Sequence, residues 1–270
     1  MINTEIIFFF IYCFIGWICE EIYCSALAKK IVNRGFLHGP YLPIYGFGAM
    51  TVLFLLEPFI NNIFLLFVCG MVTTSIIEYI GSFLLEKIFH IKLWDYSKNF
   101  LNINGRVCLL NSTMFGLLSL LMVYVIHPFV TKVIYQLPQI AQYYMALIIV
   151  VGMSFDFALS AAKMTAFNRA LEEIKDRRYE VKEKLKALSE TDRSELVLSI
   201  KERWNEELIS RKARLARRNK RIILAFPSMV SKNDFIDNML KKVRIDFSSW
   251  LNRGKKQYEE LKQRRKNMMK

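Results

Sequence analysis

Three carboxylates stand inside apolar stretches of the sequence: Glu20, Glu78 and Asp156. An ionisable side chain is costly inside a membrane and commonly has a function there. Counted from Glu5, Ile63 and Ala141 near the starts of the three stretches, each acid lies 15 residues along its stretch. A helix rises about 1.5 Å per residue, so the three acids share one depth, about 22 Å from the outer face and in the cytoplasmic third of the bilayer.

Basic and amide side chains precede the other apolar stretches. Arg34 precedes the second stretch, and Asn104 and Arg106 precede the fourth. We therefore predict a cytoplasm-facing polar cavity for a small solute or ion, with the binding residues Glu20, Arg34, Glu78, Asn104, Arg106 and Asp156. An alternative stays open, in which the same acids pair with the arginines and nearby amides only to hold the bundle together.

Five apolar stretches must position these side chains. They are about Thr4–Ala28, Tyr41–Leu56, Ile63–Leu85, Val107–Val130 and Ala141–Ala162. A spanning helix needs about 20 mostly apolar residues, so we predict an all-α, polytopic membrane helix bundle of five spans. The second stretch is short and contains Pro43, Gly46 and Gly48, so a re-entrant or broken helix also fits it.

The distribution of lysine and arginine predicts the orientation. The segments 29–40 and 86–106 contain Lys29, Lys30, Arg34, Lys87, Lys92, Lys98 and Arg106, whereas 57–62 contains no basic residue and 131–140 contains only Lys132. Cytoplasmic loops carry an excess of Lys and Arg. We therefore place the N-terminus outside and the C-terminus in the cytoplasm, an alternation that favours a complete second span.

The charge divides the chain into two predicted domains. Residues 1–162 hold 8 Lys and Arg against 8 Asp and Glu, while residues 163–270 hold 30 against 16 and so carry the whole net charge of +14. We predict a transmembrane bundle over 1–162 and a basic cytoplasmic helical tail over 163–270.

The tail has the pattern of a helical hairpin. Leu171, Ile174, Val181, Leu185 and Leu188 follow heptad-like spacing that Arg178 interrupts, and a second helix is predicted over about 192–221. An antiparallel coiled coil fits this pattern. The second helix ends in a basic cluster, Arg211, Lys212, Arg214, Arg217, Arg218, Lys220 and Arg221. We expect it to meet anionic inner-leaflet lipids or a partner protein rather than nucleic acid, for which no recognised motif is present.

Several kinds of chemistry lack their motifs. No GxxxxGK[ST] sequence is present, so any ATPase that works with the chain must be a separate protein. The three histidines are scattered and the five cysteines form no CxxC pair. We expect no metal, no cofactor and no enzymatic activity, since no nucleophile–base pair is evident either.

Several motifs resemble those of a known family. Gly16-Trp17, Asn33-Arg34-Gly35-Phe36, Gly39-Pro40-Tyr41, Trp94-Asp95-Tyr96-Ser97 and Asn102-Ile103-Asn104-Gly105-Arg106 occur in order. Over about residues 5–165 the chain is similar to the CmpB-like putative ABC-transporter type IV permease family. The resemblance implies a multi-pass protein of the bacterial cell membrane that takes part in transport.

Two functions remain open at this point. The first is a permease-like subunit that moves a small solute or ion through the predicted cavity. The second is a non-transporting membrane scaffold or sensor that recruits a partner through its cytoplasmic coiled coil.

Overall fold

The structure is a computed structural model that describes residues 2–28, 35–189 and 194–245. The described residues are mainly helical and contain no β-strand, as the prediction of an all-α fold requires. The chain forms two compact units, one of residues 1–165 with 224–229 and the other of residues 166–223 with 230–270. Each unit is described by itself below.

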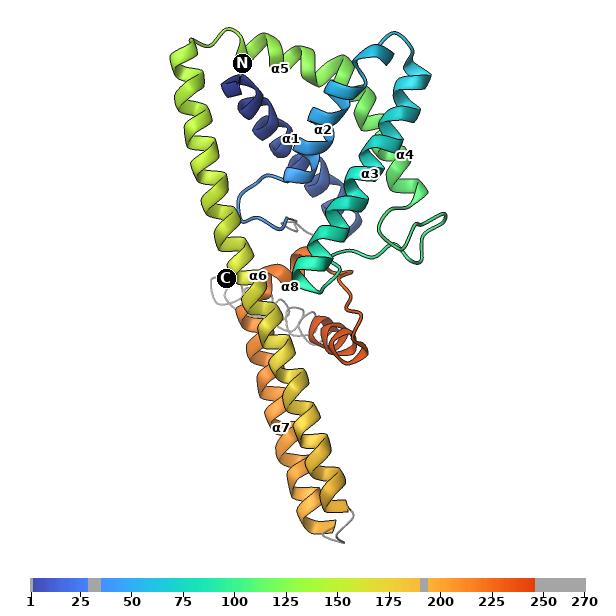
Figure 1. Cartoon of the computed structure of the whole chain (residues 1–270), viewed down its shortest axis with the longest axis vertical. Helices are drawn as coiled ribbons and strands as arrows, with labels where there is room; N and C mark the ends of the chain where they lie inside the picture. Colours follow the sequence, from blue (N-terminus) through green and yellow to red (C-terminus); the bar gives the residue numbers. More distant parts are fainter. Residues whose placement is uncertain (1, 29–34, 190–193, 246–270) are drawn as a thin grey trace, which may run out of the picture. The chain divides into compact units, whose positions relative to one another are not determined.

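Four helical segments of the described chain are long and apolar enough to cross a membrane: Ile2–Tyr23, Ile63–Phe89, Leu109–Ile134 and Gln139–Leu188. They belong to helices α1 (Ile2–Ala28), α3 (Ile63–Phe89), α4 (Leu109–Leu121) with its continuation, and α6 (Gln139–Ser189). In Figure 1 the chain runs downward in α1 and α3 and in the first half of α6, and upward in α4. Four of the five predicted spans therefore have a matching helix.

The second predicted span is a shorter helix than expected. Helix α2 covers Pro43–Leu55, 13 residues, and begins at the proline. Proline favours the first helical position because it donates no hydrogen bond there and its φ is already helical. At about 1.5 Å per residue, α2 covers about 20 Å, less than the hydrocarbon core of about 30 Å. A fifth complete span stays a prediction, although α2 runs upward in Figure 1 whereas α1 runs obliquely downward.

Small residues let the helices of the first unit approach closely. A Cβ atom on Gly16 of α1 would overlap the Tyr45 ring of α2, and one on Gly46 would overlap Cys13 of α1. Gly70 of α3 meets Ser119 of α4 in the same way. Glycine and serine at such contacts are typical of membrane helix pairs.

The helix that begins with α4 contains a wider turn. The wider turn is the π-helical turn η2 (Met122–Ile126), which joins α4 to α5 (His127–Ile134). A separate short 3-10 turn, η1 (Glu57–Phe59), precedes α3. Pro128 lies directly after η2, and it has no N–H to donate to the preceding turn. π-Turns inside helices occur often at functional sites.

Helix α6 presents two faces within the first unit. One face is buried or half-buried at Gln142, Ala146, Ile149, Met153, Asp156 and Ser160. The other exposes large apolar side chains such as Ile148, Val151 and Phe155, which are 72%, 60% and 66% exposed. A continuous apolar surface of this kind suits contact with lipid.

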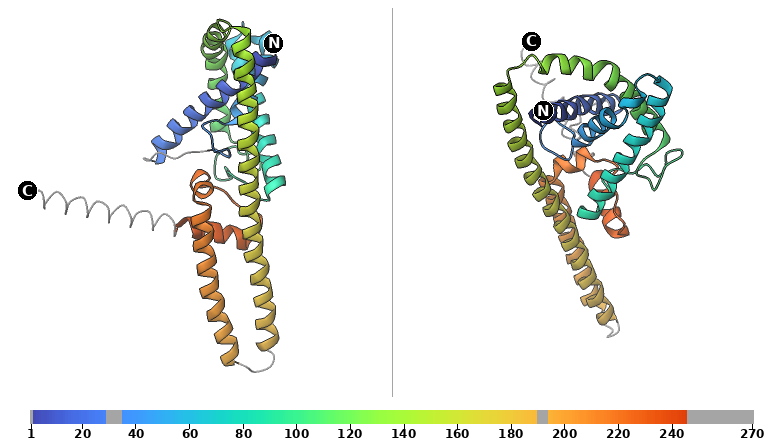
Figure 2. Two further views of the ribbon diagram at one scale, coloured as in Figure 1. Left: turned by 90° about the vertical axis from the view of Figure 1, so that its left-hand side faces the viewer. Right: turned by 45° about the horizontal axis from the view of Figure 1, so that its top comes forward.

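In the second unit the end of α6 lies beside α7 (Ser194–Arg218), and the two helices run antiparallel (Figures 1 and 2). Phe167, Leu171, Ile174 and Val181 are buried along α6. Arg178 occupies the next position of this pattern, and its guanidinium lies 4.3 Å from the centre of the Phe235 ring. Arg178, which interrupts the heptad pattern, therefore makes a cation–π contact with Phe235. This ring belongs to the helical residues 234–245. The supercoil of the hairpin stays a prediction.

Candidate functional site

Asp156 is bound by the segment that precedes α2. Its Oδ1 accepts hydrogen bonds from the His38 N–H (3.0 Å) and the Ser160 hydroxyl (3.1 Å). Its Oδ2 accepts from the Gly39 N–H (2.8 Å) and the Tyr41 hydroxyl (2.7 Å). Both carboxylate oxygens are thus satisfied, and the acid joins α6 to residues 38–41.

His38 extends this group of contacts. Its Nδ1 lies 3.1 Å from Asp156 Oδ1 and 2.7 Å from Ser160 Oγ, and its Nε2 lies 2.8 Å from Lys163 Nζ. A lysine ammonium can only donate, so Nε2 is the acceptor and the proton of the neutral ring is on Nδ1. The sequence predicted Asp156 as a binding residue. It did not predict that the partners of Asp156 would be residues 38–41 and Ser160 of α6.

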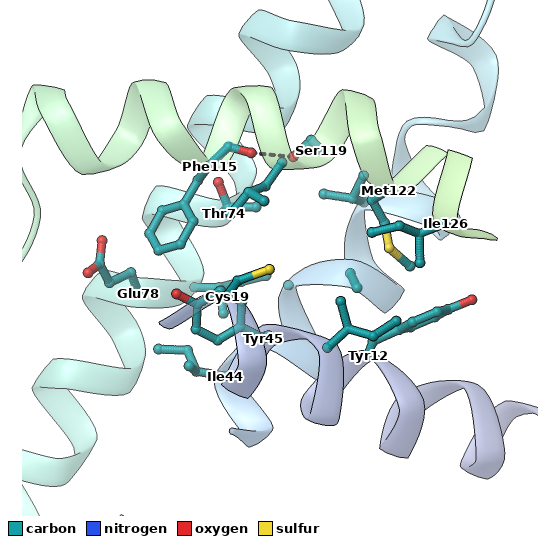
Figure 3. Close-up of a pocket in the computed structure, with 17 residues that line it drawn as sticks. Tyr12, Cys19, Ile44, Tyr45, Thr74, Glu78, Phe115, Ser119, Met122 and Ile126 are labelled. Carbon is teal, nitrogen blue, oxygen red and sulfur yellow. Dashed lines mark hydrogen bonds between the residues drawn. The ribbon is translucent and has the colours of Figure 1, made fainter. Parts of the chain in front are cut away.

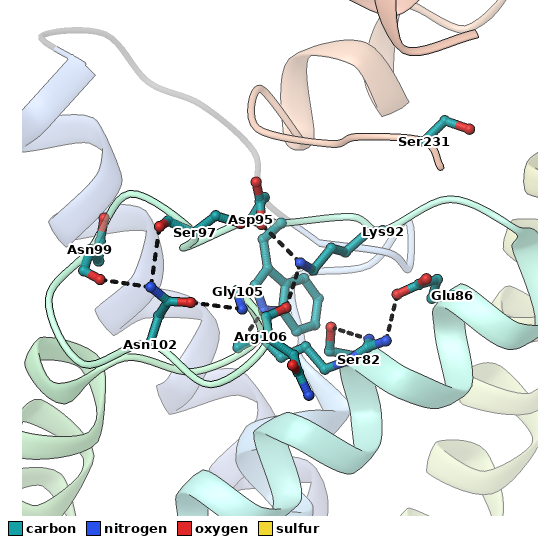
Figure 4. Close-up of polar contacts among 12 residues, drawn as sticks. Ser82, Glu86, Lys92, Asp95, Ser97, Asn99, Asn102, Gly105, Arg106 and Ser231 are labelled. Carbon is teal, nitrogen blue, oxygen red and sulfur yellow. Dashed lines mark hydrogen bonds and ion pairs between the residues drawn. The ribbon is translucent and has the colours of Figure 1, made fainter. Parts of the chain in front are cut away.

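Arg106 pairs with an acid that we did not predict. Its Nη2 lies 2.6 Å from Glu86 Oε2, and its Nη1 donates to the Ser82 hydroxyl (3.2 Å). The guanidinium carbon also lies 5.5 Å from the ring centres of Tyr79 and Phe83. Figure 4 shows the ion pair at the end of α3.

A sequence signal for this pair existed. Glu78, Ser82 and Glu86 follow one another at intervals of four residues, which places them on one face of a helix. All three are buried. Glu86 lies in the last turn of α3, after the end of the predicted span at Leu85, so the sequence did not place it beside the other acids.

A hydrogen-bonded loop, residues 90–108, holds Arg106 in place (Figure 4). The Lys92 ammonium donates to Asp95 Oδ1 (2.8 Å) and to the Asn104 carbonyl (2.8 Å). Gly105 has a φ of +63°, and a Cβ atom there would overlap the Asp95 carboxyl. The predicted site residue Asn104 is exposed, and its amide donates to the Tyr79 hydroxyl at 2.9 Å.

The charge of Asp95 is part of this loop. Burial opposes its ionisation, but hydrogen bonds from Lys92 and Ser97 outweigh that effect and lower the pKa of Asp95 below its ordinary value. The carboxylate therefore stays ionised and stabilises the loop at neutral pH.

Glu20 and Glu78 lie near one another on α1 and α3. The Tyr45 hydroxyl of α2 donates to Glu20 Oε2 (2.8 Å). Glu20 is close enough to Glu78 for electrostatic repulsion, and the side chains of Asn111 and Tyr96 also lie near Glu78. Glu78 is 5% exposed, and its Oε2 is buried without a hydrogen-bond partner among the residues that the structure describes.

A cavity opens beside Glu78 between α1, α2, α3 and α4. Its volume is about 90 Å³. The apolar part of its wall includes Ile15, Ile44, Val52, Phe115 and Met122. Figure 3 shows Glu78 at one end of the lining residues and Met122 and Ile126, which belong to the π-turn, at the other.

The predicted binding residues therefore do not form one cluster in the described chain. Glu20 and Glu78 lie together, Arg106 pairs with Glu86, and Asp156 binds residues 38–41. Arg34 lies outside the described residues. The cavity that does form is mainly apolar rather than polar, and among the six predicted residues it is lined by Glu78.

The predicted basic cluster lies at the end of α7 and in α8 (Lys220–Ala225). Arg214, Arg217, Arg218 and Lys220 are exposed, whereas Arg211, Lys212 and Arg221 are half-buried. Arg211 Nη2 lies 2.7 Å from Glu207 Oε1, so one charge of the cluster is compensated within its own helix.

One comparison with known proteins gives a match. The model of a protein family described as putative ABC-transporter type IV (ABC_trans_CmpB) matches residues 7–161. No curated protein and no solved structure matches the chain. The matched residues include α2, α3 and α4 and every residue that lines the cavity.

Proposed function

Because the chain belongs to the putative ABC-transporter type IV family, we propose that it is the membrane subunit of a transport system and that a solute passes through the cavity beside Glu78. Family membership and the apolar helices make it a membrane protein. The observation that carries the proposal is the position of the cavity, which lies between helices of the segment that the family model matches.

The energy for transport would come from another chain. The sequence contains no GxxxxGK[ST] motif, which ATP-driven systems use to bind the nucleotide phosphates. We propose a separate ATPase that binds the cytoplasmic side of this subunit.

The proposed topology has five membrane crossings, with the N-terminus outside and the C-terminus in the cytoplasm of a bacterial cell. Two observations support it: the excess of Lys and Arg in 29–40, in 86–106 and after residue 162, and the upward course of α2 between the downward courses of α1 and α3 in Figure 1. The 13 helical residues of α2 are too few to cross the hydrocarbon core by themselves. For α2 to cross it, the bilayer would have to be thinner there, or non-helical chain would have to complete the crossing.

Isolation of the native complex tests the transport proposal. We expect a tagged copy, purified from its own membrane in mild detergent, to bring down an ATPase in stoichiometric amount. We also expect Glu78→Gln to abolish transport-dependent growth while the protein accumulates in the membrane as before. Glu57→Gln is the matched control, since Glu57 is an exposed acid of the same unit.

Two results would contradict the transport proposal. The first is the absence of any ATPase from repeated isolations. The second is the loss of the Glu78→Gln protein from the membrane, which would make Glu78 a residue of the bundle's packing rather than of a pathway.

A second candidate function is a scaffold or sensor that acts through the second unit. The exposed basic residues of α7 and α8 favour it, because each would contribute about 1 kcal/mol near an anionic lipid surface. Replacement of Arg214, Arg217, Arg218 and Lys220 by glutamine should then abolish function, while Glu78→Gln should have no effect. The transport proposal predicts the opposite: Glu78→Gln should abolish function, and the four glutamine replacements should have a smaller effect.

A further inference from the structure

The loop of residues 90–108 exposes three large apolar side chains close together in the sequence. Phe100, Leu101 and Ile103 are 76%, 64% and 60% exposed. We refer to these three side chains as the apolar edge. A group of exposed apolar side chains of this kind marks a surface that contacts protein or membrane.

The loop holds the apolar edge in a defined conformation. The Asn102 amide nitrogen donates to the carbonyls of Ser97 (3.1 Å) and Asn99 (2.9 Å). The Asn102 amide oxygen accepts from the Gly105 N–H (3.0 Å). Leu101 has a φ of +47°, in the left-handed region where a residue with a side chain is strained. Such strain persists only where the surrounding contacts impose it, so the folded loop fixes where the edge lies.

The apolar edge lies beside the first turn of α4. The Leu109 N–H donates to the Phe100 carbonyl (3.4 Å), and the Asn99 amide nitrogen lies 3.5 Å from Cys108 Sγ. Leu109 begins the apolar segment Leu109–Ile134, which is long enough to cross a membrane. Phe100 therefore lies at the depth in the bilayer at which this segment starts.

The surface beside the apolar edge is one that lipid covers. Leu109 and Leu110, at the start of α4, are both exposed, so the apolar surface continues from Phe100 onto the helix. In Figure 1 and in the right-hand view of Figure 2, the loop projects sideways from the ends of α3 and α4 rather than along their axes. Lipid that surrounds the start of α4 therefore also reaches the edge.

The exposed charges near the apolar edge are positive. Among residues 83–110 the exposed Lys, Arg, Asp and Glu side chains are Lys87 and Lys98. The two acids of this range, Glu86 and Asp95, are buried or half-buried and belong to ion pairs. Apolar side chains beside lysines suit the interfacial layer of a bilayer, where acyl chains adjoin phosphate groups.

We propose that the apolar edge inserts into the interfacial layer of the bilayer beside α4, with Lys98 at the phosphate groups of anionic lipid. The rigid loop would then fix the depth at which α3 and α4 meet the membrane surface. The proposal requires that α4 crosses the membrane, and it holds whether or not the chain transports a solute.

Photo-crosslinking to lipid tests the proposal on the unmodified chain. The full chain is placed in nanodiscs of phosphatidylcholine and phosphatidylglycerol, with a diazirine on the upper acyl chain of the phosphatidylglycerol, and is irradiated and digested with trypsin. Cleavage after Lys98 and Arg106 releases residues 99–106, which contain the whole edge. Cleavage after Lys92 releases residues 93–98 of the same loop, whose large apolar side chains are buried or half-buried. We expect lipid adducts on residues 99–106 in clear excess over residues 93–98.

A tryptophan in place of Phe100 measures the depth of insertion. Emission of Phe100→Trp, taken as the difference from the unmodified chain, should lie at shorter wavelength than that of Tyr179→Trp. Tyr179 is the matched control because it is an exposed aromatic residue in the second unit. Lipid brominated high on its acyl chains should quench Phe100→Trp and leave Tyr179→Trp unchanged.

The same variant tests the contact of Lys98 with anionic lipid. Brominated phosphatidylglycerol should quench Phe100→Trp more strongly than brominated phosphatidylcholine at the same content, because the lysine attracts the anionic headgroup. The further replacement Lys98→Gln should remove this difference. Equal quenching by the two lipids in the presence of Lys98 would overturn its assignment to anionic phosphate groups.

Two results would overturn the insertion of the apolar edge. The first is an equal yield of lipid adducts on residues 99–106 and 93–98, or no adduct on residues 99–106. The second is emission of Phe100→Trp at the wavelength of the Tyr179→Trp control, without quenching by brominated lipid. The edge would then be a surface for a protein partner. The crosslinking needs no variant, so it decides the question even if Phe100→Trp fails to fold.

Discussion

Three buried or half-buried charged side chains of the first unit differ in how their polar atoms are bonded. Asp156 receives donors from two backbone N–H groups and two hydroxyls, and Arg106 pairs with Glu86 and lies over two aromatic rings. Glu78 lacks a partner for one oxygen in the described chain. The difference matters because satisfied groups stabilise a bundle, while a buried group without a partner costs free energy.

Asp156→Asn should destabilise the first unit. Asparagine presents one acceptor oxygen and one donor group, so at least two of the present donors would lose their acceptor. We expect a loss of about 3 kcal/mol, the range for two hydrogen bonds to a charged group. Thermal unfolding of the purified protein checks this, with Glu173→Gln, an exposed acid of α6, as the control. An unchanged melting temperature would contradict the role of Asp156 as a link to residues 38–41.

The Arg106–Glu86 pair should be strongly coupled. Arg106→Gln alone leaves a buried carboxylate without its cation and should cost about 3–5 kcal/mol. The double variant Arg106→Gln, Glu86→Gln removes both charges and should recover more than half of that loss. Additive losses in the double-mutant cycle would show that the two side chains stabilise the protein independently.

At the scale of elements, the loop of residues 90–108 acts as a rigid connector between α3 and α4. Hydrogen bonds of Lys92, Asp95, Asn102 and Gly105 close it, and Trp94 Nε1 donates to the Arg106 carbonyl (3.2 Å). His90, Leu101 and Asn104 adopt positive φ, as does Gly105. These contacts determine where Arg106 lies, so the ion pair depends on the whole loop.

The stability of this loop should depend on pH through Asp95. The pKa of Asp95 is lower in the folded chain than its ordinary value of 3.8, so the carboxylate stabilises the loop fully above that value. The contribution should disappear as the pH falls below 3.8 and through the lower folded pKa. Hydrogen exchange in residues 95–107, corrected for the intrinsic pH dependence, should rise in that range and stay constant between about pH 5 and 8.

Asp95→Asn provides the matching variant for the loop. It should give fast exchange in residues 95–107 at neutral pH, because asparagine does not hold the Lys92 ammonium as an ion pair. If hydrogen exchange in residues 95–107 of this variant still rises as the pH falls below 3.8, the pH effect belongs to another group.

At the scale of the whole molecule, the chain divides into two compact units with different surfaces. The first exposes apolar side chains on α3, α4 and α6, and the second exposes basic side chains on α7 and α8. Lipid can cover the first kind of surface, and anionic lipid or an acidic protein can compensate the second.

The number of crossings decides the topology of the first unit. Five crossings place residues 2 and 61 on the same face of the membrane, whereas four crossings without α2 place them on opposite faces. We expect an impermeant maleimide to label both Ile2→Cys and Asn61→Cys in intact cells; both positions are exposed. Labelling of only one of the two in intact cells would exclude α2 as a crossing helix.

The sequence alone determined the properties that depend on composition and on distance along the chain. The apolar stretches and the charge division near residue 162 follow from counting residues, and the predicted depth of each acid follows from the constant rise of a helix. The all-helical architecture and four of the five predicted apolar spans have matching helices in the structure. The heptad pattern of the tail was also visible, including its interruption at Arg178.

Only the tertiary structure decided which side chains meet. Depth does not tell how a helix is rotated about its axis or which helix lies beside it, and both depend on contacts such as those of Gly16 and Gly46 with their neighbours. Glu20, Glu78 and Asp156 share a predicted depth, but Asp156 turns to residues 38–41 and Glu78 to an apolar cavity. The spacing of Glu78, Ser82 and Glu86 shows that they share a helix face, but Arg106 bonds to Glu86 because the 90–108 loop folds back on α3, which only the tertiary structure reveals.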